Sequence, residues 1–225
     1  DFGEKVHQVR KRCKKMRALL RLVRKSFGDY NDENRAFRDM ARGISEVRDR
    51  QTLIESYDRV MCAYEGDIDR RAFAPIRARL TRDLNEIRAD PDTHERLGRM
   101  RGELERAAAR IHTWEIDAKG FDALAGGLAK TYKRARKRMD DAWRSPTGPV
   151  LHEWRKRTKY HWYHARLLEE INTGMMPATV DQLDQLSDTL GDHHDLVILA
   201  MRLDQDDFGP ATGLAAFHAL AEAER

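Results

Sequence analysis

Two histidines in this sequence are followed by nearly the same run of cationic residues. His7 lies in residues 6–17, VHQVRKRCKKMR, and His152 lies in residues 151–162, LHEWRKRTKYHW, so the two copies are 145 positions apart. Arginine offers a fork of donors to phosphate oxygens, lysine a mobile point charge, and histidine a donor that gains charge at mildly acid pH. These residue types, repeated at one spacing, indicate a site for an anion rather than an accidental surface.

The spacing within each copy places the cations on one face of an α-helix. Residues at i+3, i+4 and i+7 from the histidine fall in one sector, and apolar residues such as Cys13 and Leu20 lie opposite. Like charges on neighbouring turns repel by a few tenths of a kcal/mol per pair, a cost that a bound polyanion would offset. The predicted anion-binding residues are His7, Arg10, Lys11, Lys14, Arg17 and Arg21 in the first copy and His152, Arg155, Lys156, Lys159 and Arg166 in the second.

A third basic row has no histidine. Its four cations lie in a helix predicted over residues 119–143, and apolar residues, including Phe121 and Tyr132, are predicted behind them. Several such rows line a groove if their helices are neighbours, and a groove concentrates an anion. The cations of this row are Lys130, Lys133, Arg134 and Lys137.

Each histidine-bearing helix is followed by a second repeated segment that ends in aspartate. ISEVRD over residues 44–49 matches LGDHHD over residues 190–195, at an offset of 146. A carboxylate placed beside Arg or His orients that neighbour through charge-assisted hydrogen bonds. We therefore predict that Asp49 and Asp195 orient the cations, and acid–base catalysis by these two residues is the alternative.

The positive charge of the chain is concentrated in two segments. The formal net charge is only +4, but residues 1–28 carry +8 and residues 128–166 carry +9. Basic segments of this kind attract polyanions. Charged residues make up 36% of the chain, compared with about 25% in an average domain, and this composition favours amphipathic helices.

The remaining composition predicts a cytoplasmic protein that does not cross a membrane. Two cysteines, Cys13 and Cys62, are too few for a disulfide scaffold, so both are predicted to be reduced thiols in the core. No run of about 18 apolar residues indicates a membrane span. No P-loop, HExxH or dinucleotide-binding glycine pattern indicates an enzyme, and no cofactor is predicted.

The hydrophobic residues recur with a period close to 3.6, which predicts an all-α fold. We predict one domain over residues 1–225, with repeat halves of about 1–115 and 116–225 that form two four-helix bundles about a pseudo-twofold axis. The chain begins without Met, and the first copy lacks a counterpart of the helix over 119–143, so truncation at both ends is expected. The expected helices run over roughly 4–27, 32–64, 69–89, 93–115, 119–143, 150–172 and 178–203, and an eighth begins after Gly209-Pro210.

The doubled H-x-x-R-K-R-x-K helix with its downstream Arg-Asp or His-Asp segment resembles the CHAD family, the conserved histidine α-helical domains. The resemblance covers nearly the whole chain and implies two four-helix bundles with a basic surface at their junction. It also implies non-catalytic binding of inorganic polyphosphate and association with polyphosphate granules. Two departures are that Trp162 replaces Arg17, and His194 replaces Arg48, in the second copy. The residues that carry the resemblance are His7, Arg10, Arg12, Lys14, Arg17, Arg48, Asp49, His152, Arg155, Lys159, Leu190, Gly191, His194 and Asp195.

Three other interpretations stay open at this point. Nucleic acid or another polyanion is an alternative partner, for which Trp162 and Tyr163 would supply stacking surfaces. A histidine phosphotransfer domain also presents a histidine on a four-helix bundle, although the glycine typical of its motif is absent. His161-x-x-His164 has the spacing of a metal site, but the surrounding cations disfavour a divalent ion, so no metal is predicted.

Overall fold

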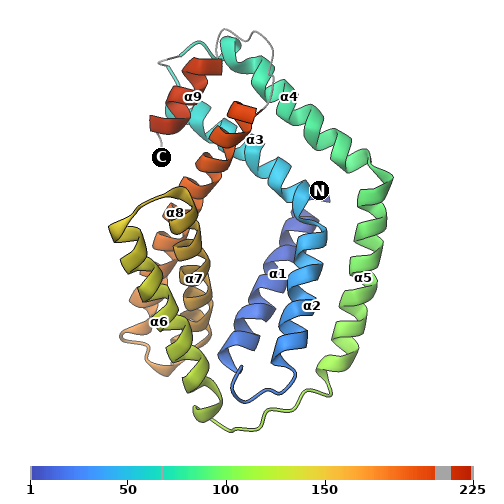
Figure 1. The fold of residues 1–225 in the computed structure, drawn as a ribbon, viewed down its shortest axis with the longest axis vertical. Coiled ribbons are helices and arrows are strands. Elements are labelled where there is room, and N and C mark those ends of the chain that lie inside the picture. The colour runs from blue at the N-terminus through green and yellow to red at the C-terminus, as the bar shows by residue number, and fades with distance from the viewer. Residues whose placement is uncertain (1, 67, 206–213, 224–225) are drawn as a thin grey trace.

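The computed structural model describes residues 2–66, 68–205 and 214–223, which form helices and connecting turns without any strand (Figure 1). The predicted all-α class is confirmed. None of the helices in these ranges is long and apolar enough to cross a membrane. The elements are α1 (Phe2–Leu22), α2 (Tyr30–Gly43), α3 (Ser45–Ala63), α4 (Arg70–Ala89), α5 (Pro91–Ile111), α6 (Asp122–Arg144), α7 (Gly148–Leu167), the 3-10 turn η1 (Glu169–Ile171), α8 (Met176–Gln205) and α9 (Leu214–Ala223).

Most predicted helices are present, but the single helix predicted over 32–64 is wrong. The structure divides it into α2 and α3 at Gly43 and Ile44. Glycine is a weak helix former, and Ile44 leaves the helical region with φ −120° and ψ 19°. The break lets Ile44 and Val47 pack into a small core with Val6. The eighth predicted helix corresponds to α9, although its predicted start after Gly209-Pro210 lies outside the described residues.

The sequence repeat is also a repeat of structure. Helix α1, moved by 145 positions, coincides with α7, and α2 followed by α3, moved by 146 positions, starts where α8 starts. The main difference is that α8 runs without a break through the position that matches Gly43. Each copy is therefore a basic helix followed by an antiparallel partner whose second half extends beyond it (Figure 1).

The helices pack so that the two copies meet along α1 and α7. Helix α1 contacts α2 on one side and α6 and α7 on the other, and α7 lies between α6 and α8. Helix α3 contacts the long α8, while α4 and α5 form an outer arm that returns from α3 to α2 (Figure 1). The division into two four-helix bundles about a pseudo-twofold axis stays a prediction.

Separate hydrophobic clusters stabilise the different parts of this network. The largest cluster includes Tyr57, Phe73 and Phe217, and joins α3, α4, α8 and α9. A second cluster contains Cys13 and Phe37, and it joins α1, α2 and α5. Cys13 is a free, buried thiol, as predicted. The prediction for Cys62 is wrong: this thiol is also free but exposed, near the end of α3.

Helix α6 is oriented differently from the prediction. Phe121 and Tyr132, predicted behind the basic row, are 59% and 48% exposed. The buried stripe of α6 instead consists of small residues four or seven positions apart, which let the helix approach its neighbours closely. Gly127 is the tightest of these contacts, since an added Cβ would lie 1.8 Å from the carbonyl oxygen of Leu22 on α1. The residues of the stripe are Ala123, Gly127, Thr131, Ala135 and Ala142.

Candidate anion-binding site

The two copies of the basic motif bring their charges together at one place, which we call the junction cluster. It is formed by α1, α3, α7 and α8, which contact one another in this region. The charges of its members are close enough to shift one another's pKa. The members are Arg10 and Lys14 from α1, Arg48 and Asp49 from α3, His152 and Arg155 from α7, and His194 and Asp195 from α8.

Arg10 and Arg155 occupy equivalent positions in the two copies and are both largely covered by protein. The Arg10 side chain is 16% exposed, and its Nη2 lies 3.6 Å from Oδ1 of Asp49. Arg155 lies against the backbone of α8, where the missing side chain of Gly191 leaves it room: a Cβ there would lie 3.2 Å from Arg155 Nε. Arg10 Nη1 and Arg155 Nε are buried donors with no hydrogen-bond partner in the part of the chain that the structure describes.

The charges of both arginines act on Lys14. Its side chain is exposed to solvent but has many protein atoms around it. That crowding, followed by the charges of Arg10 and Arg155, lowers its pKa to about 8. Lys14 forms no ion pair with any described carboxylate within 4 Å, although the charge of Asp49 partly opposes the shift. A cation held beside other cations in this way favours the approach of an anion.

Two histidines complete the junction cluster from the second copy. The rings of His152 and His194 have centroids 4.0 Å apart. Burial and then the neighbouring His152 and Arg155 lower the pKa of His194 to about 4, and burial also lowers the pKa of His152. His7, the counterpart of His152, is half-buried on α1, and burial followed by the charge of Arg48 lowers its pKa. All three are therefore neutral near pH 7 and donate from imidazole rather than imidazolium.

The two predicted orienting carboxylates are placed unequally. Asp49 forms the ion pair with Arg10, as an orienting residue would. Asp195 lies near Arg155 and Arg59, but burial raises its pKa more than these charges lower it. An orienting contact is thus present in the first copy, and for Asp195 the orienting role stays a prediction.

A second group of cations, the Arg21 cluster, lies further along α1 and extends onto α6 and α7. Arg17 and Arg21 donate to Oδ1 of Asn34 on α2, at 3.4 and 2.7 Å. The Arg21 guanidinium also lies 4.2 Å from the ring centroid of Tyr160 on α7. Burial, followed by the charges of Arg21 and Arg134, lowers the pKa of Arg24. Burial, followed by the charge of Arg134, lowers the pKa of Arg157. The members are Arg17, Arg21, Arg24, Arg134 and Arg157.

Arg24 and Arg157 were missed by reasoning from the sequence. Arg157 stands two positions after Arg155, so a helical wheel places it on the opposite side of α7 from the predicted basic face. The fact that α1 and α6 both pack on that side could not be known from one helix alone. The recurrence of Arg12 as Arg157 at the repeat offset was the available signal.

Lys159 and Trp162 are not the exposed groups that the sequence indicated. Lys159 Nζ lies 3.5 Å from Asp184 and 3.6 Å from Asp188, both on α8, and 4.0 Å from the ring centroid of Trp162. Trp162 is only 5% exposed and packs with Val180. The prediction of Trp162 as a stacking surface is therefore wrong, because an apolar partner on α8 draws the indole into the core.

The other predicted ligands lie outside the junction cluster. Lys156 pairs with Glu153 at 2.5 Å, and Arg166 lies 5.4 Å from the ring centroid of Trp162. Lys11 is half-buried on α1, and Tyr163 is half-buried on α7. The remaining cations of the α6 row are exposed and form no ion pair or hydrogen bond with the described residues; these are Lys130, Lys133 and Lys137.

His161 and His164, which have the spacing of a metal site, are packing residues. The ring of His161 lies edge-on to Tyr132, with centroids 5.4 Å apart. His164 is 1% exposed, and its Nε2–H donates to the carbonyl oxygen of Ala18 at 2.8 Å. Since this nitrogen is engaged with α1, His164 ties the two copies of the motif together.

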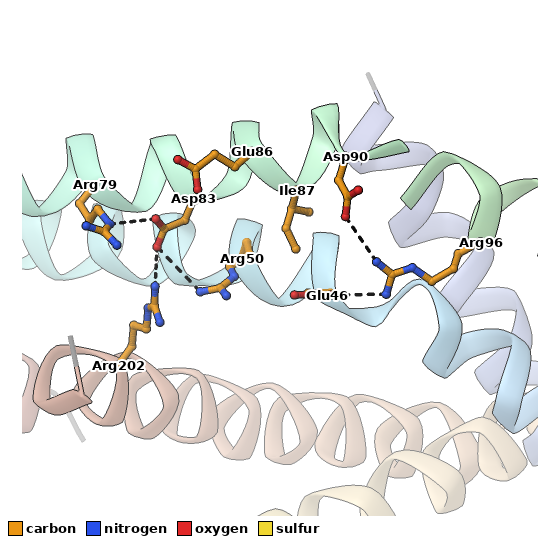
Figure 2. A pocket seen from close by; sticks show the side chains of 9 residues that line it. All are labelled: Glu46, Arg50, Arg79, Asp83, Glu86, Ile87, Asp90, Arg96 and Arg202. Atoms are coloured by element: carbon orange, nitrogen blue, oxygen red, sulfur yellow. Dashed lines mark hydrogen bonds and ion pairs between the residues drawn. The ribbon is translucent and has the colours of Figure 1, made fainter. Parts of the chain in front are cut away.

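A pocket between α3, α4 and α5 is lined by residues that belong to neither cationic cluster (Figure 2). Asp83 stands at one end and accepts from Arg79 at 2.9 Å and from Arg202 at 2.5 Å, with Arg50 at 3.8 Å. At the other end Arg96 pairs with acidic residues. Its four arginines are balanced by four carboxylates, so the pocket joins helices rather than presenting a net positive charge to a ligand.

The sequence also matches a known protein family. A family model of the CHAD domain matches residues 1–204. The chain belongs to the CHAD family. The match covers α1 through most of α8, and thus both copies of the basic motif and the whole junction cluster. No curated protein and no solved structure matched the chain.

Proposed function

We propose that this CHAD domain binds inorganic polyphosphate at the junction cluster and does not turn it over. The observation that carries the proposal is the pair Arg10 and Arg155, equivalent in the two copies, each of which keeps a buried donor without a partner among the described residues. Buried donors are nearly always satisfied in folded proteins, so two in one cationic cluster favour an anionic ligand. Phosphate oxygens match the fork of donors that arginine presents.

The electrostatics of the cluster support a ligand with many charges. Arg10, Lys14 and Arg155 lie near one another with one paired carboxylate, and desolvation followed by the charges of the two arginines lowers the pKa of Lys14. An anion at this place relieves the repulsion. A linear polyphosphate also reaches the Arg21 cluster from the same binding position, so its successive phosphates act multivalently.

Nucleic acid and catalysis are less well supported. Trp162, the indole that the basic motif itself carries, is buried and offers no surface for base stacking. His152 Nδ1 is buried, so this nitrogen is closed to a phosphoryl donor. We therefore assign the histidines to phosphate binding. We further propose that the protein acts in the cytoplasm at polyphosphate granules, where its ligand would be.

The proposal is tested by competition. Labelled long-chain polyphosphate bound to the purified chain is titrated with single-stranded RNA at equal phosphate concentration, in physiological salt. Polyphosphate should remain bound, and incubation with magnesium should release no orthophosphate. Displacement by RNA would favour a nucleic-acid-binding protein, and release of orthophosphate would show an enzyme; either result overturns the proposal.

A further inference from the structure

The helices that follow the two basic helices carry opposite charges at equivalent positions. At the offset of 146 that aligns α2 and α3 with α8, three arginines of α2 match three aspartates of α8. At these three positions the first copy has an arginine and the second copy has a carboxylate. The matched pairs are Arg35 with Asp181, Arg38 with Asp184, and Arg42 with Asp188.

In the second copy the aspartates neutralise the basic helix. Asp184 and Asp188 both lie within 3.6 Å of Lys159 Nζ, as described above. Next to them, the position of Arg17 is taken by Trp162, which packs on Val180. Ion pairs and an apolar contact therefore occupy the surface that the basic motif would otherwise present to an anion.

In the first copy the positions of Lys159 and Trp162 are held by cations that form no ion pair with the described carboxylates, Lys14 and Arg17, while Arg35 and Arg38 pair with Asp32 and Asp39 of their own helix. Lys14, the counterpart of Lys159, forms no ion pair with a described carboxylate. Arg17 and Asn34 stand where the second copy has Trp162 and Val180, and they form a hydrogen bond in place of the apolar contact. Arg38 is 37% exposed, and its Nε and Nη2 donate to Asp39 of its own helix. Burial, together with the charges of Arg21 and Arg38, lowers the pKa of Arg17.

The difference is large when it is summed over each hairpin. Helix α1 with residues 30–49 carries a net charge of +6, whereas α7 with residues 176–195 carries −1. A polyanion at the junction cluster is therefore attracted by one copy and repelled by the stripe of aspartates on the other. The two copies repeat the same helices, but the surface of the first copy is positively charged and that of the second is not.

We propose that polyphosphate leaves the junction cluster in one direction only, along α1 and α2 over Lys14, Arg17 and Arg38, and that the equivalent surface of the second copy, around Lys159 and Trp162, is not part of its path. This inference rests on the proposed function. It adds Arg38 to the ligand residues and removes Lys159 from them.

The test compares equivalent positions in the two copies. Affinity for long-chain polyphosphate is measured as a function of salt for the wild type, Arg38→Gln and Lys159→Gln. Removing a phosphate contact lowers the slope of log K against log salt by about one. We expect that loss for Arg38→Gln, together with a several-fold weaker affinity, and less than a twofold change for Lys159→Gln.

A third variant tests the same idea by a gain of binding. Asp184→Asn combined with Asp188→Asn frees Lys159 and removes two negative charges, so the affinity should rise and the salt slope should steepen. Thermal melting of each variant checks that the fold is intact. Equal losses for Arg38→Gln and Lys159→Gln would overturn the one-directional path, while absence of binding by the wild type would instead overturn the proposed function.

Discussion

The Nε2–H of His164 on α7 donates to the carbonyl oxygen of Ala18 on α1, at 2.8 Å, and thereby joins the two copies of the basic motif. Burial, opposed only in part by this hydrogen bond, lowers the pKa of His164 to about 4. The ring is therefore neutral in the folded protein well below the pH at which it becomes charged in the unfolded chain, where its pKa is about 6.5.

This contact predicts a pH-dependent stability. Because the unfolded state binds the proton more tightly, the contribution of His164 is complete above about pH 6.5 and is lost as the pH falls toward about 4, at roughly 1.4 kcal/mol per unit. The free energy of unfolding, measured by urea unfolding across this pH range, should change less with pH for His164→Gln than for the wild type. Identical slopes would mean that His164 is not a buried neutral group.

Asp83 should be the most sensitive carboxylate of the fold. It is 8% exposed and pairs with Arg79 on its own helix, Arg202 on α8 and Arg50 on α3 (Figure 2). Asp83→Asn leaves these guanidinium groups without their counter-charge, which costs about 3–5 kcal/mol in a buried pair.

Calorimetric or urea unfolding checks this value against a matched exposed pair. Glu105 accepts from Arg101 at 3.0 Å with both side chains more than 60% exposed, so Glu105→Gln should change the free energy of unfolding by at most about 0.5 kcal/mol. Similar effects of the two substitutions would contradict the role of Asp83 as the link between α3, α4 and α8.

Gly127 should be required for the packing of α6 on α1. An added Cβ would lie 1.8 Å from Leu22 O and 2.5 Å from Arg21 O, both backbone atoms that cannot move aside cheaply. Gly127→Ala should therefore lower the free energy of unfolding by about 1–3 kcal/mol. Gly98→Ala is the control: nothing lies within 4 Å of its added Cβ on α5, so it should stabilise by about 0.5–1 kcal/mol. A gain at both positions would show that backbone freedom alone matters and that Gly127 is not a close helix contact.

Sequence periodicity predicted the features that depend on one helix. The basic faces of α1 and α7, the repeat and most helix ends follow from local spacing, which is fixed by the geometry of the α-helix. The features it missed depend on the partner helix. Trp162 is buried because Val180 faces it, and Lys159 is neutralised because Asp184 comes from α8.

The error on α6 has a similar origin. A search for large apolar residues selected Phe121 and Tyr132, whereas the contact with α1 and α7 uses small residues that carry little hydrophobic signal. The break at Gly43 was missed because the apolar period continues through it into α3. In both cases the deciding quantity is the distance to another helix.

Binding of polyphosphate should weaken as the pH rises past about 8. Burial and the charges of Arg10 and Arg155 lower the pKa of Lys14 to about 8, so the free protein loses this charge where an ordinary lysine keeps it. A bound polyanion raises that pKa again, and binding above pH 8 must take up a proton. Lys14→Arg keeps its charge throughout, so its affinity between about pH 7 and 9 should change less than that of the wild type. Parallel curves would exclude Lys14 from the site.

The most direct measurement concerns the two equivalent arginines. Equilibrium binding of long-chain polyphosphate is measured at physiological salt for the wild type, for Arg10→Gln combined with Arg155→Gln, and for the exposed control Lys119→Gln, with circular dichroism to verify folding. We predict that the double variant loses at least about tenfold in affinity, or 1.4 kcal/mol, and about two in salt slope, while the control is unchanged. A wild type that does not bind, or a folded double variant that binds as the wild type does, would contradict polyphosphate binding at the junction cluster.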